Sequence, residues 1–238
     1  IKYIIAIFGL CLSAFAQVDG TLDNSFLPNN TGEKGAEDNV LVAKELANGK
    51  ILLGGSFDRY NGKTQRLFVR INQDGSIDDT FNPVVFNPNG RVRDILIQPD
   101  GKIVVGGDFA VDIDEDNDGF EDYEIRDVIR LNPDGSRDTS FLPAISATVS
   151  CGSVFSLALQ SHNKIVVGGT IGSCFGNSDN ANIYRLNTDG TIDTSFNANV
   201  DTSLIFSERV NKIVVQSDGK FIIGGNFTKV NGNDSDFL

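Results

Sequence analysis

Internal repetition is the feature of this sequence that most restricts its fold. An eight-residue motif, which opens with Asp-Gly and closes with Phe, occurs four times and begins at Asp19, Asp74, Asp134 and Asp189. The glycines of successive copies are 55, 60 and 55 residues apart. A motif that recurs at such a period within one chain indicates a repeated structural unit that stacks on its neighbours.

Two further blocks recur in a fixed order between these motifs. One is a lysine, three apolar residues and a Gly-Gly pair, found at residues 49–55, 101–107, 163–169 and 219–225. The other is an arginine followed by an apolar residue and an asparagine, at Arg70, Arg130 and Arg185. Because three different blocks keep the same order, the repeat is specific rather than a chance similarity of composition.

Each repeat is predicted to consist of antiparallel strands. In the second copy, residues 91–98 alternate apolar and polar side chains and end at Asp100-Gly101, a tight hairpin signal. Residues 102–109 form the next strand, and glycines inside a strand indicate that another backbone approaches closely. A third strand ends near Asn132, and a short fourth strand is expected to reach Phe141. The predicted fold is therefore all-β and β-propeller-like.

The number of repeats predicts an incomplete ring. Four Gly-Gly strands give about 3.5 blades of three to four strands, whereas propellers close with about 4 to 8 blades. The sequence also stops where the first copy leads into its Arg70 strand. We therefore expect the chain to be a piece of a larger propeller.

An aspartate recurs in the middle of each Asp-Gly motif, at Asp23, Asp78, Asp138 and Asp193. A short carboxylate three residues after a turn glycine can accept backbone N–H groups and fix the corner. The recurring arginines are expected to pair with these carboxylates between blades. We therefore interpret both sets as scaffolding rather than as catalytic groups.

The three blocks resemble the delta-60 repeat family of secreted bacterial proteins. The resemblance covers essentially all of residues 17–238 and implies a propeller-like structure. It implies no defined biochemical activity.

The N-terminal segment, residues 1–16, is predicted to be a secretory signal peptide. Lys2 supplies a basic n-region, residues 3–15 form a short apolar run, and Ala14 and Ala16 make a cleavage site. The alternative is a buried N-terminal strand or helix. The run is shorter than the roughly 20 residues that span a bilayer, and no second one follows. We therefore expect cleavage after Ala16, a secreted or cell-surface location, and no transmembrane segment in the mature protein.

The charge of the chain narrows the class of partner. Its formal net charge is −12, and removal of the signal peptide would take away one further positive charge, Lys2. Such a surface repels phosphate backbones, which argues against nucleic acid and anionic membranes. It suits solubility and the binding of cations.

The second repeat carries an acidic insertion at residues 112–124, in which eight of thirteen residues are acidic. Alternate carboxylates followed by a glycine have the spacing of a calcium loop, although Ile125 stands where an EF-hand has its bidentate glutamate. The alternative is a merely solvated acidic loop. The predicted calcium ligands are the side chains of Asp114, Asp116, Asp118 and Asp122 and the carbonyl of Phe120.

Two cysteines, Cys151 and Cys174, remain after signal cleavage. They lie at nearly equal distances from the hairpin turn at residues 161–163, which places them on adjacent antiparallel strands within disulfide range. An even count in an exported protein also indicates a disulfide. A bulge at the Gly-Gly pair would change this register, and two free thiols are the alternative.

Three functions remain open. The first is a secreted or surface propeller that binds an extracellular protein or glycan, with calcium rigidifying one loop. The second is a carbohydrate-active enzyme, a glycosidase or lyase, and the third is a structural or adhesive repeat array. The only histidine, His162, is expected at an exposed turn, which argues against Ser-His-Asp and Cys-His catalysis. We therefore favour a binding module.

Overall fold

The computed structural model describes residues 4–5, 15–16, 22–23, 35–116, 118–142, 152–171, 182–198, 200, 209–231 and 233–234 of the chain. These residues form strands and turns, and their one helical segment is the 3-10 turn η1 (Ser161–Asn163). The predicted all-β class is confirmed. No helix in the described part is long and apolar enough to cross a bilayer.

Four antiparallel sheets, which we number blades 1 to 4, correspond to the sequence repeats. Blade 1 holds β4 (Val40–Glu45), β5 (Ile51–Gly55) and β8 (Phe68–Ile71); blade 2 holds β9 (Arg91–Ile97), β10 (Ile103–Ile113) and β11 (Tyr123–Leu131); blade 3 holds β12 (Val154–Leu159), β13 (Ile165–Gly169) and β14 (Ile183–Leu186); the described part of blade 4 holds β15 (Arg209–Val215) and β16 (Phe221–Asn226). In blades 1 to 3 the Gly-Gly strand is central.

Short strands complete the inventory. The hairpins β6 (Arg59–Tyr60) with β7 (Lys63–Thr64), and β17 (Lys229–Val230) with β18 (Asn233–Asp234), follow the Gly-Gly strands of blades 1 and 4. Near the N-terminus, β1 (Ile4–Ile5), β2 (Phe15–Ala16) and β3 (Leu22–Asp23) pair as a small sheet. The rest of residues 1–16 lies outside the described residues, so signal cleavage stays a prediction.

The fourth strand expected in each repeat is reduced to a single bridge. Leu131 bridges Arg137 after the Asp-Gly turn, and equivalent bridges join Ile71 to Ile77 and Leu186 to Ile192. The chain turns directly afterwards, because the N–H of Phe141 bonds to the carbonyl of Asp138 (3.1 Å) instead of to a strand. Blades 1 to 3 therefore have three strands each.

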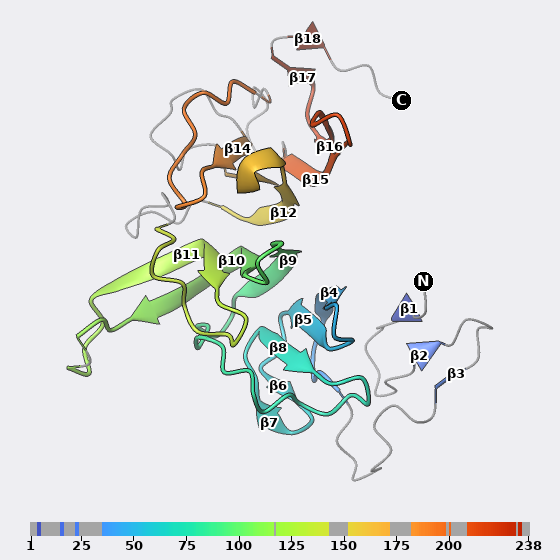
Figure 1. Ribbon diagram of the computed structural model, residues 1–238, viewed down its shortest axis with the longest axis vertical. Coiled ribbons are helices and arrows are strands. Elements are labelled where there is room, and N and C mark those ends of the chain that lie inside the picture. Colours follow the sequence, from blue (N-terminus) through green and yellow to red (C-terminus); the bar gives the residue numbers. More distant parts are fainter. Residues whose placement is uncertain are drawn as a thin grey trace.

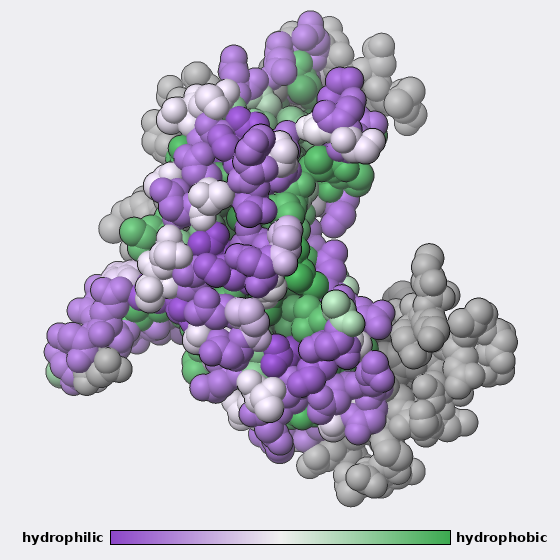
Figure 2. Space-filling view, in the orientation of Figure 1, coloured by the Kyte–Doolittle hydropathy of each residue, from purple (hydrophilic) through white to green (hydrophobic). Residues whose placement is uncertain are grey.

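The blades follow one another along an arc whose concave side is lined by the first strand of each, β4, β9, β12 and β15 (Figure 1). Neighbouring first strands pack on one another, β4 on β9, β9 on β12, and β12 on β15. The hydrophobic core lies mainly between successive blades, where Val92 and Ile95 of β9 pack with the central strand of blade 1. A hydrophobic band also runs along the concave side (Figure 2).

The first glycine of each Gly-Gly pair makes this packing possible. A Cβ built on Gly54 would lie 2.4 Å from Cγ1 of Val92, and one on Gly106 would lie 2.8 Å from Cγ1 of Val154. Gly168 has the same relation to Val210, at 2.7 Å. Each first glycine therefore leaves room for a valine side chain of the next blade. The close backbone approach that the sequence predicted occurs at the second glycine, since a Cβ on Gly107 would lie 1.9 Å from the carbonyl oxygen of Arg91.

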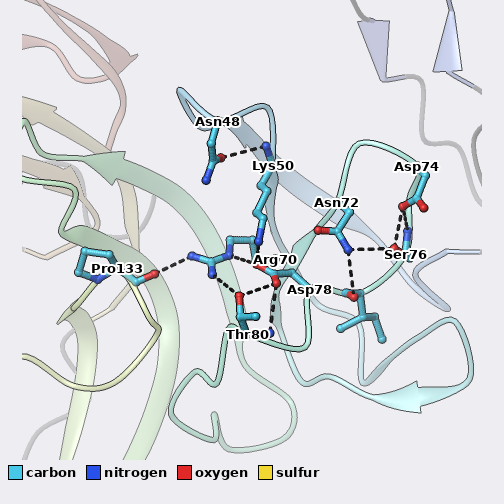
Figure 3. A network of polar contacts seen from close by, with 10 residues as sticks. Asn48, Lys50, Arg70, Asn72, Asp74, Ser76, Asp78, Thr80 and Pro133 are labelled. Atoms are coloured by element: carbon cyan, nitrogen blue, oxygen red, sulfur yellow. Dashed lines mark hydrogen bonds and ion pairs between the residues drawn. The ribbon is translucent and has the colours of Figure 1, made fainter.

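Three of the recurring aspartates, Asp78, Asp138 and Asp193, are buried in cation-rich networks, of which Figure 3 shows that of Asp78. The side chain of Asp23 lies outside the described part of the chain. Asp78 accepts hydrogen bonds from Lys50 Nζ (2.8 Å), Arg70 Nε (2.5 Å) and Thr80 Oγ1 (2.7 Å). Although burial alone raises the pKa of Asp78, the bonds from Lys50, Thr80 and Arg70 outweigh it and hold the pKa well below its usual range. The same network recurs around Asp138 and Asp193.

These networks confirm the scaffold interpretation and correct one detail of it. The predicted arginine–aspartate pairs form within a repeat, since Arg70 bonds the aspartate eight residues later. The contact between blades comes from a second nitrogen of the same side chain. Arg70 Nη1 donates to the carbonyl of Pro133 (2.6 Å), and Arg130 Nη1 donates to that of Thr188 (2.7 Å).

Two further predictions concern the hairpin of blade 3. His162 is exposed in a left-handed turn (φ 61°), followed by Asn163 (φ 55°), as expected. Cys151 and Cys174 lie outside the described residues, so their disulfide stays a prediction. The bulge that could alter their register is present, because Val154 pairs with Gly169 whereas Ser156 pairs with Gly168.

Candidate functional site

The acidic insertion forms the tip of a long hairpin in blade 2. Strands β10 and β11 contain 11 and 9 residues, whereas the matching strands of blade 1, β5 and β8, contain 5 and 4. The hairpin therefore projects from the body of the molecule, and its surface is hydrophilic (Figures 1 and 2). This geometry leaves the loop between Asp114 and Asp122 open to solvent.

Three of the four predicted carboxylate ligands converge in this loop. Asp114, Asp116 and Asp122 each offer one oxygen, and these oxygens lie within 4.8 Å of one another. Oδ1 of Asp114 is shielded from solvent and has no hydrogen-bond partner among the residues that the structure describes. Three carboxylate oxygens at this spacing match the ligands that Ca²⁺ prefers in proteins.

The loop turns as its glycine predicts. Gly119 adopts φ 91°, where a Cβ would be strained, and its N–H donates to Oδ2 of Asp114 (3.0 Å). Asp118 does not join the three-carboxylate cluster; its Oδ1 accepts the N–H of Phe120 (2.8 Å). The Phe120 side chain is 76% exposed. The turn therefore arranges the carboxylates through backbone N–H groups.

A polar clamp holds the base of the loop to the blade. Oε1 of Glu115 accepts the hydroxyl of Tyr123 (2.7 Å) and Nη2 of Arg137 (2.8 Å), and Arg137 Nη1 donates to the same hydroxyl (2.8 Å). The hydrogen bond from Tyr123, followed by that from Arg137, lowers the pKa of Glu115. Glu115 thus stays ionised as a structural group and is not free to act as a ligand.

The remaining carboxylates repel one another. The charge of Asp112 raises the pKa of Glu121, and Glu124 adds to this effect. The amide of Asn87 relieves part of the repulsion by donating to Oδ1 of Asp112 (2.9 Å) and Oε1 of Glu124 (3.5 Å). The charge balance of this hairpin therefore favours the binding of a cation.

Sequence reasoning missed a second unusual carboxylate, Asp127. It has a positive φ of 62°, it is 5% exposed, and its Oδ2 has no hydrogen-bond partner. Burial raises its pKa to about 7; the charge of Arg126 opposes this rise and that of Asp108 adds to it. Alignment of the repeats could have found it, because Leu67 (φ 61°) holds the same place before the arginine strand of blade 1.

Comparisons with known proteins agree with this architecture. A family model described as "Domain of unknown function (DUF5122) beta-propeller" matches residues 46–81, 98–120, 126–141, 160–196 and 216–238. These segments make up more than half of the chain and hold the recurring blocks. No curated protein matches the chain.

Solved structures resemble the chain in fold. The extracellular domain of BT4673 from B. thetaiotaomicron superposes with a TM-score of 0.53 at 16% identity, over 94% of this chain and 25% of that one. PorZ, a surface component of the type-IX secretion system of Porphyromonas gingivalis, gives 0.46 at 13% identity, over 90% and 28%. The chain therefore spans about a quarter of the length of these structures, and at these identities the first shows the propeller fold alone.

Proposed function

We propose that this chain, which belongs to the DUF5122 β-propeller family, is an exported or cell-surface module of delta-60 type that binds an extracellular protein or glycan. We also propose that a structural calcium ion binds in the acidic loop of blade 2. Two observations support the calcium site: one oxygen each of Asp114, Asp116 and Asp122 lie within 4.8 Å of one another, and among the described residues the buried Oδ1 of Asp114 has no hydrogen-bond partner.

Calcium would order the loop rather than take part in a reaction. Ca²⁺ takes about 6 to 8 oxygen ligands, and Kd values of roughly 10⁻⁴ to 10⁻³ M are typical of extracellular modules. The three converging carboxylates would supply the charged ligands, and the predicted ligands Asp118 and Phe120, together with water, would complete the shell. Bound calcium would also cancel the repulsion that raises the pKa of Glu121.

Calorimetric titration tests the metal site directly. We expect Ca²⁺ to bind with a Kd near 10⁻⁴ M, and Asp116→Asn and Asp122→Asn to weaken it at least tenfold, because each removes one of about three charged ligands. Asp79→Asn is the matched control, since Asp79 is also exposed but lies in the first repeat, after β8. Equal calcium affinity in Asp116→Asn and Asp79→Asn would rule out this site.

Export and binding need separate experiments. N-terminal sequencing of the protein recovered from the medium or cell surface should begin at Gln17, and a cytoplasmic product that retains Lys2 would contradict export. Glycan arrays and pull-downs from extracellular fractions test the binding role. A propeller that retains no ligand in either would be a structural array instead.

A further inference from the structure

The first strand of every blade carries the same irregularity, a one-residue bulge opposite the Gly-Gly pair. In β9, Val92 pairs with Gly107 and Asp94 with Gly106, so the residue between them has no partner in the ladder. The same shift occurs in β4, β12 and β15. A bulge turns its side chain away from the regular alternation of the sheet. The four bulge residues are Leu41, Arg93, Phe155 and Asn211.

Unlike the scaffold residues, these four residues differ completely between blades. Since the first strands line the concave side of the arc (Figure 1), the four bulges lie on that side, each with a different residue. The backbone bulge is thus the same in every blade, and only the residue at the bulge differs. This is the pattern expected of a binding edge on a fixed scaffold.

Two arginines from flanking blades stack on one aromatic ring at this edge. The guanidinium carbon of Arg93 in blade 2 lies 4.6 Å from the centroid of Phe155 in blade 3. That of Arg209, in blade 4, lies 5.5 Å from the same centroid. A guanidinium held against a ring has lost much of its rotamer freedom already and keeps its N–H donors along its edges.

The charge of this cluster is not balanced. Asp108 accepts Nε of Arg93 (2.9 Å) and Nη1 of Arg91 (3.1 Å), so one carboxylate faces two guanidiniums. Arg209 forms no ion pair with any residue that the structure describes, and it is exposed. Three guanidiniums and one carboxylate leave a local excess of positive charge in a chain whose formal net charge is −12.

We propose that Arg93 and Arg209, stacked on Phe155, together with Arg91, which shares Asp108 with Arg93, form the binding site for the carboxylate of an acidic sugar. The inference rests on the proposed binding role and specifies its ligand class; it does not depend on calcium. Arginine presents a planar fork that matches a carboxylate bidentately. Asp108 holds Arg93 and Arg91 in place through both of its oxygens, and the exposed Asn211, on the same strand as Arg209, adds an amide that can bond sugar hydroxyls.

A sugar acid fits this edge better than a peptide does. Peptide grooves hold their ligands through rows of apolar pockets or free strand edges. The concave side carries a hydrophobic band (Figure 2), but of the large exposed apolar side chains among the described residues only Leu41 is a bulge residue. The stacked arginines, a carboxylate and an amide instead offer polar groups suited to a charged, hydroxyl-rich ligand.

Calorimetric titration of the full chain with trigalacturonate tests the inference, and its methyl ester serves as the uncharged probe. We expect a Kd in the range of 10 μM to 1 mM for the acid, and at least tenfold weaker binding of the ester. Arg209→Ala and Phe155→Leu should each weaken the acid at least fivefold. Arg209→Lys should recover only part of the loss, because lysine keeps the charge without the fork.

Arg59→Ala is the matched control, because Arg59 is a half-exposed arginine of blade 1 paired with Glu37 (3.3 Å). It should leave the affinity for trigalacturonate unchanged within twofold. Thermal melting of each variant with and without 1 mM Ca²⁺ verifies that the fold persists.

The outcomes separate this inference from the proposed function. Equal binding of acid and ester, or equal effects of Arg209→Ala and Arg59→Ala, would overturn the acidic-sugar site. Absence of trigalacturonate binding, with a neutral glycan or a protein captured by the chain, would also overturn it and leave the binding module intact. Absence of every ligand would overturn both. If the chain instead captured an acidic peptide, and Arg209→Ala abolished that capture, the cluster would bind carboxylates of a peptide. This outcome would reject the acidic-sugar inference.

Discussion

The buried carboxylate of Asp127 should make this protein more stable in mild acid than at alkaline pH. Its pKa in the folded chain is about 7, against 3.8 for an ordinary aspartate. Because each pH unit of such a difference is worth about 1.4 kcal/mol, folding loses about 4 kcal/mol as the pH rises from below 4 to above 7. About 3 kcal/mol of this loss falls between pH 5 and pH 8.

The substitution that isolates this effect is Asp127→Asn. The protein itself places Asn182 at the equivalent position of blade 3, and Asn tolerates the left-handed backbone. The new amide of Asp127→Asn would be buried without a partner, which costs about 1–3 kcal/mol. Relative to wild type, the variant should therefore be more stable to unfolding by about 1–3 kcal/mol at pH 8 and equally stable at pH 5. The difference in unfolding free energy between variant and wild type should therefore grow by about 3 kcal/mol across this range.

Urea unfolding followed by circular dichroism at pH 5, 6, 7 and 8 measures this difference. EDTA and constant ionic strength keep calcium binding out of the comparison, since a ligand of the native state would add its own stabilisation. Asp79→Asn, an exposed substitution, should show no dependence on pH relative to wild type. A constant difference between Asp127→Asn and wild type from pH 5 to 8 would refute the reasoning.

Three further predictions concern the scaffold. Gly106→Ala should lower the unfolding free energy by about 1–3 kcal/mol in urea unfolding, because its Cβ would meet Val154 at 2.8 Å, whereas Gly224→Ala, with nothing within 4 Å, should change it by less than about 0.5 kcal/mol. Asp138→Ala should cost about 3–5 kcal/mol in the same assay, since it leaves the buried guanidinium of Arg130 without its carboxylate. The low pKa values of Asp78 and Asp138 add stability that is fully present above about pH 4 and is lost as the pH falls further, so an acid titration followed by circular dichroism should show unfolding below pH 4. Equal urea midpoints for the two alanine variants, full native stability of Asp138→Ala, or an intact fold at pH 2 would contradict the respective prediction.

The sequence repeat alone predicted most of the scaffold, because its three blocks determine turns and contacts that form locally. The Asp-Gly turns, the Gly-Gly floor and the buried Asp78 all depend on contacts with short-range or strictly periodic partners. The partner of Arg70 was placed in the wrong blade, since one guanidinium reaches both its own aspartate and the next blade. The spacing of residues in the sequence cannot show which guanidinium nitrogen bonds which partner.

The candidate sites were predictable only in part, for a different physical reason. The acidic loop is local, so its spacing indicated the convergence of Asp114, Asp116 and Asp122, whereas Asp118 was used by the turn itself. The arginine cluster combines residues from three blades on one ring, and only the curvature of the arc brings Arg93 and Arg209 to Phe155. No periodic pattern in the sequence encodes that meeting.

In this repeat, scaffold residues differ from candidate binding residues in whether their polar and charged groups have partners. The recurring residues satisfy one another's hydrogen-bonding groups. Asp78, for example, accepts hydrogen bonds from a lysine, an arginine and a threonine. Three groups outside the recurring set leave capacity unused: among the residues that the structure describes, the buried Oδ1 of Asp114 and Oδ2 of Asp127 have no hydrogen-bond partner, and Arg209 has no ion pair. Protonation accounts for Asp127, because burial raises its pKa to about 7, whereas the unused capacity of Asp114 and Arg209 is what the proposed calcium and acidic-sugar sites would use.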